Sequence, residues 1–548
     1  MTGARRGWIV AGMMLALPPS LAAAQDTTIV KVDSAAVTRV QVTADTGFAA
    51  CMVDCVPARP EFRASPLLPF EHWAVQAARR AEAMGLTRFF PAQRAVPRAQ
   101  VARALDEAAQ MARARDDEAN GGHPAVRRLA AGWQARFREE FPEYTSVGAR
   151  TSGGVTVLGA HAAGGYDRWA GRLAPAIGYL SSRQDPRALG DVSDPRATLE
   201  TGIATSWASV SAEGAYRGGE AVLRRWDAAV GFGAFQLGVG RAQVGYGWGR
   251  TGGIVYSTPD AMPRVELQST RPFHLPWVFR KIGPVTLHTF AGPVNDPARH
   301  PTNPNLWGMR VAVQPHPRLT LGANRGSMFG GEGDPITVKN LASMLAGVIR
   351  SNFENQVVSL DARYRLPTDR VLPATAYVEW GADDAAGAFD ETPGRVIGLF
   401  LPALPSAPQV GVGTEYTYFK HWCCGHGPWY LNFTFPGNWA VRGRPLGHPL
   451  GGEGSEYAAY AQADLWDARL RVDARGWIRD RSDRSLNGGR YNGGGNLFTP
   501  GRAGRSRGGS VEAALRLLPR AELRGAWVLD DGGGWREQSL GTSLAWTF

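Results

Sequence analysis

The chain contains few cysteines, only four in 548 residues, namely Cys51, Cys55, Cys423 and Cys424. This scarcity excludes a cysteine-dense scaffold and leaves room for one or two disulfides in an exported protein. Further zinc ligands for the Cys51–Cys55 pair would have to come from His421 or His426, far away in the sequence. The compartment therefore favours disulfides over a metal site.

Long hydrophobic runs are equally scarce. Beyond the N-terminus, no run reaches the roughly 18 apolar residues that a membrane-spanning helix needs. Basic residues exceed acidic ones, 60 Lys and Arg against 49 Asp and Glu, so the formal charge is +11. This balance suits an acidic partner such as an anionic glycan or a lipopolysaccharide phosphate, and a basic loop surface without any partner is the alternative. The arginines are scattered, so no nucleic-acid partner is expected.

The N-terminus is typical of an export signal. Arg5 and Arg6 precede an apolar core from Trp8 to Leu17, and Ala22–Ala24 offers a small-residue cleavage site before Gln25. We therefore expect a signal peptide at 1–24 and export from the cytoplasm. An irregular periplasmic arm is expected at 25–65.

Residues 66–145 show helical periodicity. Apolar residues recur at three- and four-residue steps in three stripes that begin near Trp73, Val101 and Val126, and Gly85 and Pro142 stand where helices should end. Such stripes are usually packing surfaces rather than ligand sites. We predict a small periplasmic α-helical domain over 66–145.

From residue 146 to residue 548, short segments alternate apolar and polar residues. In 358–366, the apolar residues share one face, and the opposite face carries Ser359, Asp361, Arg363 and Arg365. A period of two is typical of a β-strand, and both a soluble sandwich and a membrane barrel show it.

Two features favour a barrel. The last segment, Ser539–Phe548, places its large apolar residues on one face and ends on an aromatic residue, as the terminal strand of outer-membrane barrels does. Tight connections, such as Trp466–Ala468 and Leu518–Arg520, alternate with long ones near 326–355, 383–409, 436–455 and 480–508. Short periplasmic turns alternating with long outer loops are the layout of a transmembrane antiparallel β-barrel, which we expect over 146–548. Its length accommodates about 16 to 18 strands of about 10 residues each.

The same layout gives a hypothesis for the cysteines. Counting back from Phe548 puts the connection Cys423–Pro428 on the periplasmic side, together with the arm that carries Cys51 and Cys55. Neighbouring cysteines rarely bridge each other because the ring is strained. We therefore predict that Cys51 and Cys55 pair with Cys423 and Cys424 and fasten the arm under the barrel mouth.

One region resembles a known family. Its segments are Gly245–Gly249, Pro263–Gln268, Gly283–Gly292, Leu306–Val311, Pro315–Gly322 and Met328–Gly333. Over about 245–335 they are similar to the capsule assembly Wzi family. The resemblance implies an outer-membrane β-barrel of about 18 strands, with a periplasmic helical bundle and no enzymatic activity, that binds capsular polysaccharide as a lectin. The cysteines match nothing in the family's pattern, and its binding residues cannot be carried over because they lie in variable outer loops.

The sequence contains no convincing catalytic motif. No Ser/His/Asp, HExxH or P-loop pattern occurs in the local structure that its chemistry requires. Gly247, Gly249 and Gly252 formally match GxGxxG, but no amphipathic helix follows them. These glycines are expected to allow turns or to relieve crowding near the lumen. We therefore expect no enzyme, no cofactor and no metal.

The interior of the barrel can also be predicted. Pro335 opens an apolar, helix-like run, Ile336–Ile349, within a long outer loop, and we expect this helix to fold inward and occlude the lumen. Inward charges such as Asp361, Arg363, Arg471 and Asp473 should form cross-strand salt bridges rather than an anionic-sugar site.

The predicted function is non-enzymatic attachment or organisation of capsular or extracellular polysaccharide at the outer membrane, by a monomer that also contacts lipid and lipopolysaccharide. A diffusion porin or a sugar-selective channel is the alternative. Aromatic faces suit sugar rings and Arg suits carboxylates, although Trp439 also fits a membrane-interface belt. The candidate ligand-binding residues are Trp439, Arg442, Arg444, Tyr491 and Asn492.

Overall fold

The computed structural model divides the chain into two compact units, Met1–Pro60 and Glu61–Phe548. All of the residues that it describes belong to the second unit. They are residues 62–117, 123–141, 154–164, 179–182, 195–217, 220–258, 261–296, 302–332, 335–346, 353–369, 371–383, 393–420, 429–431, 439–441, 444–486, 502–519, 521–533 and 535–547. The predicted signal peptide and all four cysteines lie outside the described residues.

Three helices come first: α2 (Trp73–Ala83), α3 (Arg98–Asp117) and α4 (Pro124–Glu140). A two-stranded sheet of β1 (Leu67–Leu68) and β2 (Val96–Pro97) accompanies them. α2 begins at His72, whose Nδ1 accepts the Ala74 N–H at 3.2 Å, and it ends before Gly85, whose φ of 69° is unstrained for glycine. The three stripes are confirmed as packing surfaces, because they meet in one hydrophobic core. None of the described helices is both long enough and apolar enough to cross a membrane.

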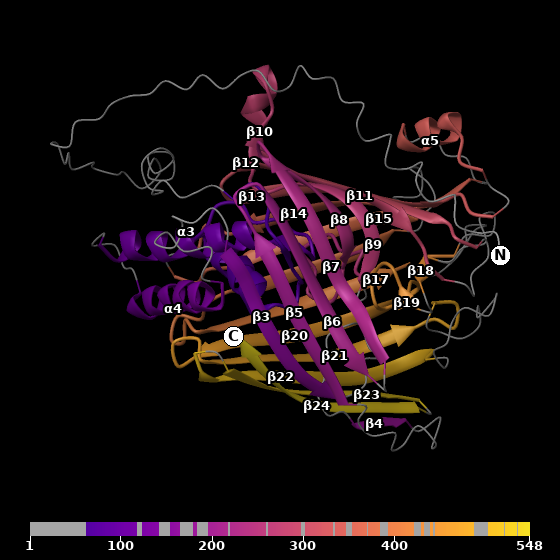
Figure 1. The fold of residues 1–548 in the computed structure, drawn as a ribbon. Helices are drawn as coiled ribbons and strands as arrows, with labels where there is room; N and C mark the ends of the chain where they lie inside the picture. The colour runs from indigo at the N-terminus through magenta and orange to yellow at the C-terminus, as the bar shows by residue number, and fades with distance from the viewer. Residues whose placement is uncertain are drawn as a thin grey trace. The chain divides into compact units, whose positions relative to one another are not determined.

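The rest of the described chain is mainly β-strand (Figure 1). The strands are β3 (Gly154–Gly164), β4 (Tyr179–Ser182), β5 (Pro195–Ala204), β6 (Ala208–Arg217), β7 (Glu220–Phe232), β8 (Phe235–Ala242), β9 (Met262–Ser269), β10 (Phe273–His274), β11 (Pro284–Pro293), β12 (Asn305–His316), β13 (Leu319–Phe329), β14 (Glu354–Arg365), β15 (Thr375–Asp383), β16 (Gly394–Leu401), β17 (Val410–Phe419), β18 (Ala440–Val441), β19 (Arg444–Pro445), β20 (Gly454–Leu465), β21 (Leu470–Arg481), β22 (Gly504–Leu518), β23 (Ala521–Gly532) and β24 (Trp535–Thr547). Two short helices interrupt them, η5 (Trp277–Ile282) and α5 (Val338–Leu345).

The large sheet returns on itself. It contains 20 of the described strands, each antiparallel to its neighbours, and β18 pairs only with β19. β9 pairs with β8 on one side and with β11 on the other, and β24 pairs with β23 and with β3. Without the short additions β4 and β10, the closed ring has 18 described strands, as the barrel prediction requires. Closure leaves the ring without an unpaired edge.

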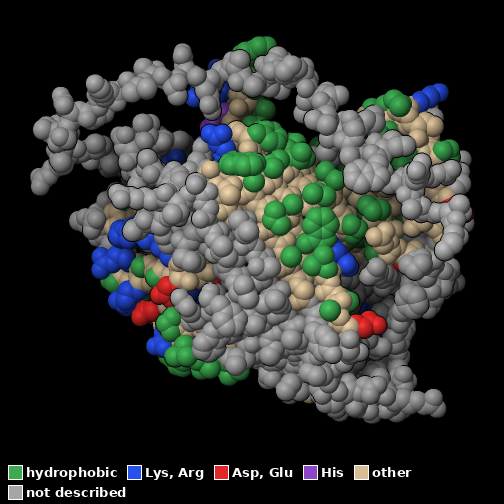
Figure 2. Space-filling model, in the orientation of Figure 1, with side chains coloured by type: hydrophobic (Ala, Val, Ile, Leu, Met, Phe, Trp, Pro, Cys, Tyr) green, Lys and Arg blue, Asp and Glu red, His purple; other side chains and the backbone are tan. Residues whose placement is uncertain are grey.

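Burial in the sheet is the reverse of a soluble sandwich. On β14, the apolar side chains of Leu360 and Tyr364 are 58 % and 40 % exposed, while Asp361 and Arg363 are 4 % and 7 % exposed. Figure 2 shows hydrophobic side chains gathered over the outer face of the strands and Lys and Arg gathered near the helices. The predicted alternation of 358–366 is therefore confirmed, with its charged face turned inward.

The two ends of the ring differ. The helix end is defined by the turns 402–409 and 466–469, because Arg80 of α2 donates to the carbonyl oxygens of Pro402 and Pro408 and Arg136 of α4 donates to that of Ala468. The opposite end, the loop end, carries the long connections 243–261, 330–353 and 420–453. The predicted alternation is confirmed only in part. The helix end also has the longer connections 270–283 and 366–374, and the loop end has the two-residue connections 218–219 and 533–534.

The parity expected for the cysteine connection is wrong. Phe419 and Gly454 flank that connection and pair with each other at the loop end, whereas Val410 and Ala463 pair at the helix end. The count from the C-terminus failed because it treated 423–428 and 436–455 as two connections at opposite ends, whereas β17 pairs directly with β20 and one connection, 420–453, joins them. Cys423 and Cys424 lie outside the described residues, so the proposed pairing with Cys51 and Cys55 stays a prediction without the support of a shared end.

The expected occluding helix forms but does not fill the lumen. α5 begins at Thr337, whose hydroxyl accepts the Asn340 N–H at 3.1 Å. Only Met344 of this helix is buried, and Ile336, Val338 and Leu345 are exposed. Figure 1 shows α5 beside the strands rather than inside them, so this prediction is wrong.

Removing the Arg80 guanidinium should loosen the helices from the ring. Arg80 is 1 % exposed and binds Asp464 at 2.9 Å as well as the carbonyl oxygens of Pro402 and Pro408 at 2.7 and 2.8 Å. In Arg80→Met, a buried carboxylate loses its partner, which costs about 3 kcal/mol or more. We expect a lower unfolding temperature and faster proteolysis between residues 84 and 124. Arg128→Met, at an exposed position of α4, is the control; equal behaviour of both variants would contradict the assignment.

Candidate functional site

The lumen is occupied by the connection between β8 and β9, here called the lumenal segment (243–258). Its side chains at Val244, Tyr246, Ile254, Val255 and Tyr256 are at most 3 % exposed. Gly247 has a φ of 95°, and Cβ atoms at Gly249 and Gly253 would meet the carbonyl oxygens of Gly252 and Tyr246. The expectation that these glycines allow turns and close packing is confirmed, and no helix follows them.

Carboxylates on the barrel wall hold this segment. Glu415 on β17 accepts the backbone N–H groups of Arg250 and Thr251 at 2.8 and 2.9 Å and the Tyr377 hydroxyl at 2.6 Å. Glu379 on β15 accepts the Ile254 N–H at 3.2 Å. These buried carboxyl groups therefore satisfy backbone N–H groups of the lumenal segment.

The lumenal segment joins the helices to the loop end. On the helix side, Gln93 and Tyr246 form an antiparallel bridge, and the Arg94 N–H donates to the Gly245 carbonyl at 3.0 Å. On the loop side, the Tyr430 hydroxyl donates to the Ile254 carbonyl at 2.6 Å. Side chains and backbone thus form one packed column through the described lumen, continued by a single hydrophobic cluster.

His448 is a fixed neutral member of this column. It is fully buried, its Nδ1 accepts the Leu450 N–H at 3.1 Å and its Nε2 lies 2.8 Å from the Thr251 hydroxyl. Because protonated imidazole has no acceptor, this geometry requires the neutral ring. Burial lowers the pKa of His448 to about 3, and the nearby guanidinium groups of Arg475 and Arg479 act in the same direction, against Glu456.

The inward charges of the wall are paired. Arg310 binds Asp361 through two contacts of 2.5 and 3.0 Å, and Arg471 binds Asp473 at 2.6 Å. Arg363 binds Glu82 of α2 at 2.5 Å, so one of these pairs also fastens a helix. The predicted pairing of these charges is confirmed, but only Arg310 and Asp361 join two strands, because Arg471 and Asp473 both lie on β21 and Arg363 pairs with a helix.

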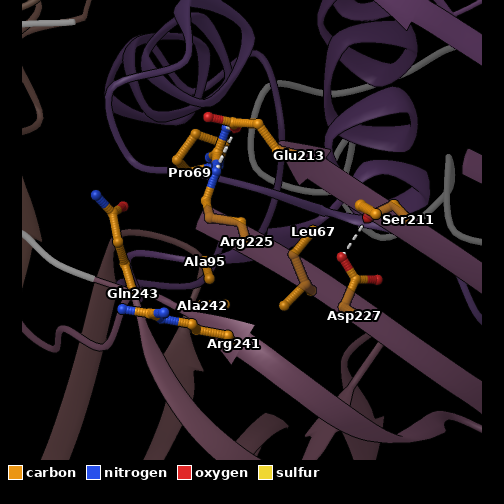
Figure 3. Close-up of a pocket in the computed structure, with 11 residues that line it drawn as sticks. Leu67, Pro69, Ala95, Ser211, Glu213, Arg225, Asp227, Arg241, Ala242 and Gln243 are labelled. Carbon is orange, nitrogen blue, oxygen red and sulfur yellow. Dashed lines mark hydrogen bonds and ion pairs between the residues drawn. The ribbon is translucent and has the colours of Figure 1, made fainter. Parts of the chain in front are cut away.

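Two described cavities beside the lumen, of about 20 and 80 Å³, are too small for a sugar. The one in Figure 3 lies between Leu67 and Pro69 and the wall of β6–β8, with a volume of about 20 Å³, room for about one water. In it the Ser211 hydroxyl donates to Asp227 at 2.5 Å. A larger hollow of about 540 Å³ opens on the wall and is lined mainly by apolar side chains such as Leu399, Val412 and Trp527, which suit lipid. No cluster of three or more His, Cys, Asp or Glu among the described residues is placed to hold a metal ion.

The predicted glycan contacts are only partly described. Trp439 is 0 % exposed, its indole N–H donates to the Val255 carbonyl at 2.7 Å, and its ring packs on Tyr256 with centroids 5.3 Å apart. Its ring therefore faces the packed column rather than solvent or a membrane interface. Arg444 lies on β19, and Arg442, Tyr491 and Asn492 lie outside the described residues. The structure does not bring the five together, and glycan contact by each of them stays a prediction.

Sequence reasoning missed the residues that fill the lumen. The lumenal segment has neither a helical nor a strand period, and its partners Glu379, Glu415 and His448 are more than 100 residues away. The available signal was its concentration of Gly and aromatic residues between two strands, where an outer loop would be more polar.

Comparison with known proteins points to one group. A family model described as capsule assembly protein Wzi matches residues 122–514. Among solved structures, the chain is similar to Wzi of Escherichia coli, described as an outer membrane protein involved in group 1 capsule assembly and a carbohydrate-binding β-barrel. The TM-score is 0.65 and the identity 15 %, over 88 % of this chain and 100 % of that one. This likeness shows the fold.

OpdL and OpdQ of Pseudomonas aeruginosa are less similar, with TM-scores of 0.43 and 0.41 and identities of 10 % and 11 %. Each comparison covers 72 % of this chain and 98 % of the other chain. No curated protein matches the sequence.

Acid should destabilise the packed column through His448. The pKa of this buried ring is below the ordinary 6.5, so its stabilising effect is complete above pH 6.5 and is lost as the pH falls toward 3. The loss amounts to about 1.4 kcal/mol per unit of pH. We expect the unfolding temperature to drop between about pH 7 and pH 4, and to drop less in His448→Asn, whose amide oxygen can still accept the Leu450 N–H. The same slope in both proteins would contradict the role of His448.

The wild-type protein should carry no steady current across a planar bilayer. A ring of about 18 strands with an empty lumen leaves a water-filled channel, but here the lumenal segment blocks it. Replacing residues 247–255 by two glycines should raise the conductance, because Tyr246 and Tyr256 are already hydrogen-bonded neighbours that a tight turn can join. Heat-modifiable mobility on gels checks that the variant is folded. A wild-type conductance equal to that of the variant would show that the column does not seal the lumen.

Proposed function

Because the chain belongs to the capsule assembly protein Wzi family, whose model matches residues 122–514, we propose that it attaches or organises capsular or extracellular polysaccharide at the outer membrane. In this proposal the protein acts as a lectin and catalyses no reaction. The E. coli protein of the same fold is described as carbohydrate-binding and as involved in capsule assembly, which supports the assignment.

The packed lumen is the observation that carries the proposal. A transport protein needs a path, whereas a lectin needs a rigid support and exposed loops. The column from Gln93 through Tyr246 to Tyr430 fills the cylinder with the protein's own side chains and gives such a support. This favours polysaccharide attachment over the diffusion-porin alternative.

The proposed orientation places the outward apolar face in lipid, the helix end in the periplasm and the loop end outside the cell. Most connections at the helix end are short, and the longest connections, such as 330–353 and 420–453, lie at the loop end. The division predicted from the sequence, a helical domain over 66–145 and a barrel over 146–548, is part of this proposal. So are the monomeric state and the contacts with lipid and lipopolysaccharide.

Glycan contact is proposed for the connections of the loop end. Arg442 and Arg444, which follow β18 in the sequence, would offer guanidinium groups to sugar carboxylates, while Tyr491 and Asn492 belong to the connection between Leu486 and Arg502. Leu486 and Arg502 are buried, so both ends of this connection are fixed to the barrel. Such fixed ends allow its length to change without unfolding the wall.

A glycan array tests the proposal directly. We expect the wild-type protein to bind a subset of acidic capsular polysaccharides. Deleting residues 488–499, and separately changing Arg442→Ser and Arg444→Ser, should each weaken binding about tenfold or more, since a charged hydrogen bond is worth about 1.5–3 kcal/mol. Arg128→Ser at the helix end is the matched control and should bind normally. Full binding by the loop variants, or none by the wild type, would refute the assignment.

A further inference from the structure

The connection between β9 and β11 carries an unusual projection. At the tip of the two-residue strand β10, η5 (Trp277–Ile282) exposes three consecutive large apolar side chains, Trp277, Val278 and Phe279, by 87 %, 71 % and 54 %. No side chain of η5 is buried. Figure 1 shows it beyond the ends of β10 and β12, clear of the sheet. A connection that only reversed the chain would not need exposed large apolar side chains.

The backbone presents these side chains at some cost. Trp277 has a φ of 55°, in the left-handed region that side chains other than glycine rarely adopt. Pro276 precedes it and Gly283, with a φ of 99°, ends the helix. Strained positions persist where the surroundings or a function require them.

The projection is continuous with the outward apolar face of the ring. Phe273 at its base packs on Phe235 with centroids 4.9 Å apart, and Phe235 packs on Phe232, which is exposed, with centroids 6.2 Å apart. Trp207 and Trp466, on two other turns of the helix end, are also exposed. Exposed tryptophans at one end of a barrel are typical of a membrane–water interface.

Two cations complete the projection. Arg280 and Lys281 are exposed and follow the apolar residues directly. An aromatic and aliphatic surface beside paired cations fits a bilayer interface, where apolar side chains enter the acyl region and cations meet phosphate groups. A soluble partner would explain neither the continuity with the apolar wall nor the row of exposed aromatics at the same end.

We propose that η5 is a membrane hook, which inserts Trp277, Val278 and Phe279 into the lipid leaflet next to the helix end and places Arg280 and Lys281 at the headgroups of anionic phospholipids. The hook rests on the membrane placement proposed above and goes beyond glycan attachment. Its effect is to fix the depth and the rotation of the barrel at one point of its circumference.

An environment-sensitive fluorophore, carried by a non-natural residue in place of Phe279, tests the hook in the full-length protein. Two further positions serve as references: Leu360 on the outward face of β14, and Val371, which is 79 % exposed in a turn of the helix end. Each labelled protein is reconstituted into vesicles of phosphatidylethanolamine and phosphatidylglycerol, and into vesicles of phosphatidylcholine alone. Heat-modifiable mobility confirms folding in every case.

The hook predicts that the label at 279 emits at shorter wavelength than the label at 371 and is quenched several-fold more by lipid-borne nitroxide. Arg280→Glu with Lys281→Glu should shift the emission at 279 to longer wavelength in phosphatidylglycerol vesicles, and not in phosphatidylcholine. A water-like label at 279 together with a lipid-like label at 360 would overturn the hook and leave the barrel placement intact.

Other outcomes separate the remaining possibilities. A water-like label at 360 would overturn the membrane placement and the hook with it. A blue-shifted label at 279 that lipid nitroxide does not quench would mean a protein contact, such as a second copy of the chain, and would also overturn the proposal. Lipid quenching that the charge reversal leaves unchanged in phosphatidylglycerol would refute the role of the two cations.

Discussion

Backbone pairing is the constraint on which the rest of the structure depends. A sheet whose outer face is apolar cannot leave a row of N–H and C=O groups unpaired in lipid, because each lost hydrogen bond costs several kcal/mol there. The ring meets this constraint where its last strand, β24, pairs with its first strand, β3. This joint connects strands from opposite ends of the ring's sequence, so the ring depends on the whole chain being in register.

Closure then determines where the charges lie. Once Leu360 and Tyr364 face outward, the alternation of the strand turns Asp361 and Arg363 into the lumen, where an unpaired charge would be costly. Arg310 pairs with Asp361, and Glu82 of α2 pairs with Arg363. The helices are thus attached to the ring by the same inward charges that the strand period creates. Arg80 and Asp464 repeat the arrangement on a neighbouring part of the wall.

Local features could be predicted from the sequence, and long-range ones could not. Three predicted features depend only on residues within a few positions of one another: the period of 358–366, the turn at Trp466–Ala468 and the helix α5. All three form. Whether α5 enters the lumen depends on competition with the lumenal segment, which no local pattern records. The side of the Cys423–Pro428 connection depended on a correct count of every connection, and counting 420–453 as two connections reversed it. Tryptophan is a residue type suited to binding sugars. The indole N–H of Trp439 nevertheless donates to the carbonyl of Val255, 184 positions earlier.

The packed column also explains why binding should be sought at the ends. The carboxylates of Glu379 and Glu415 hold backbone N–H groups of the lumenal segment, so a ligand in the lumen would have to replace hydrogen bonds that are already made. A connection that starts and ends at buried residues, such as Leu486 and Arg502, pays no such penalty when its own sequence changes. This arrangement therefore has two consequences. The packed interior stabilises the barrel, and the connections at the loop end can change in sequence and remain available for a polysaccharide.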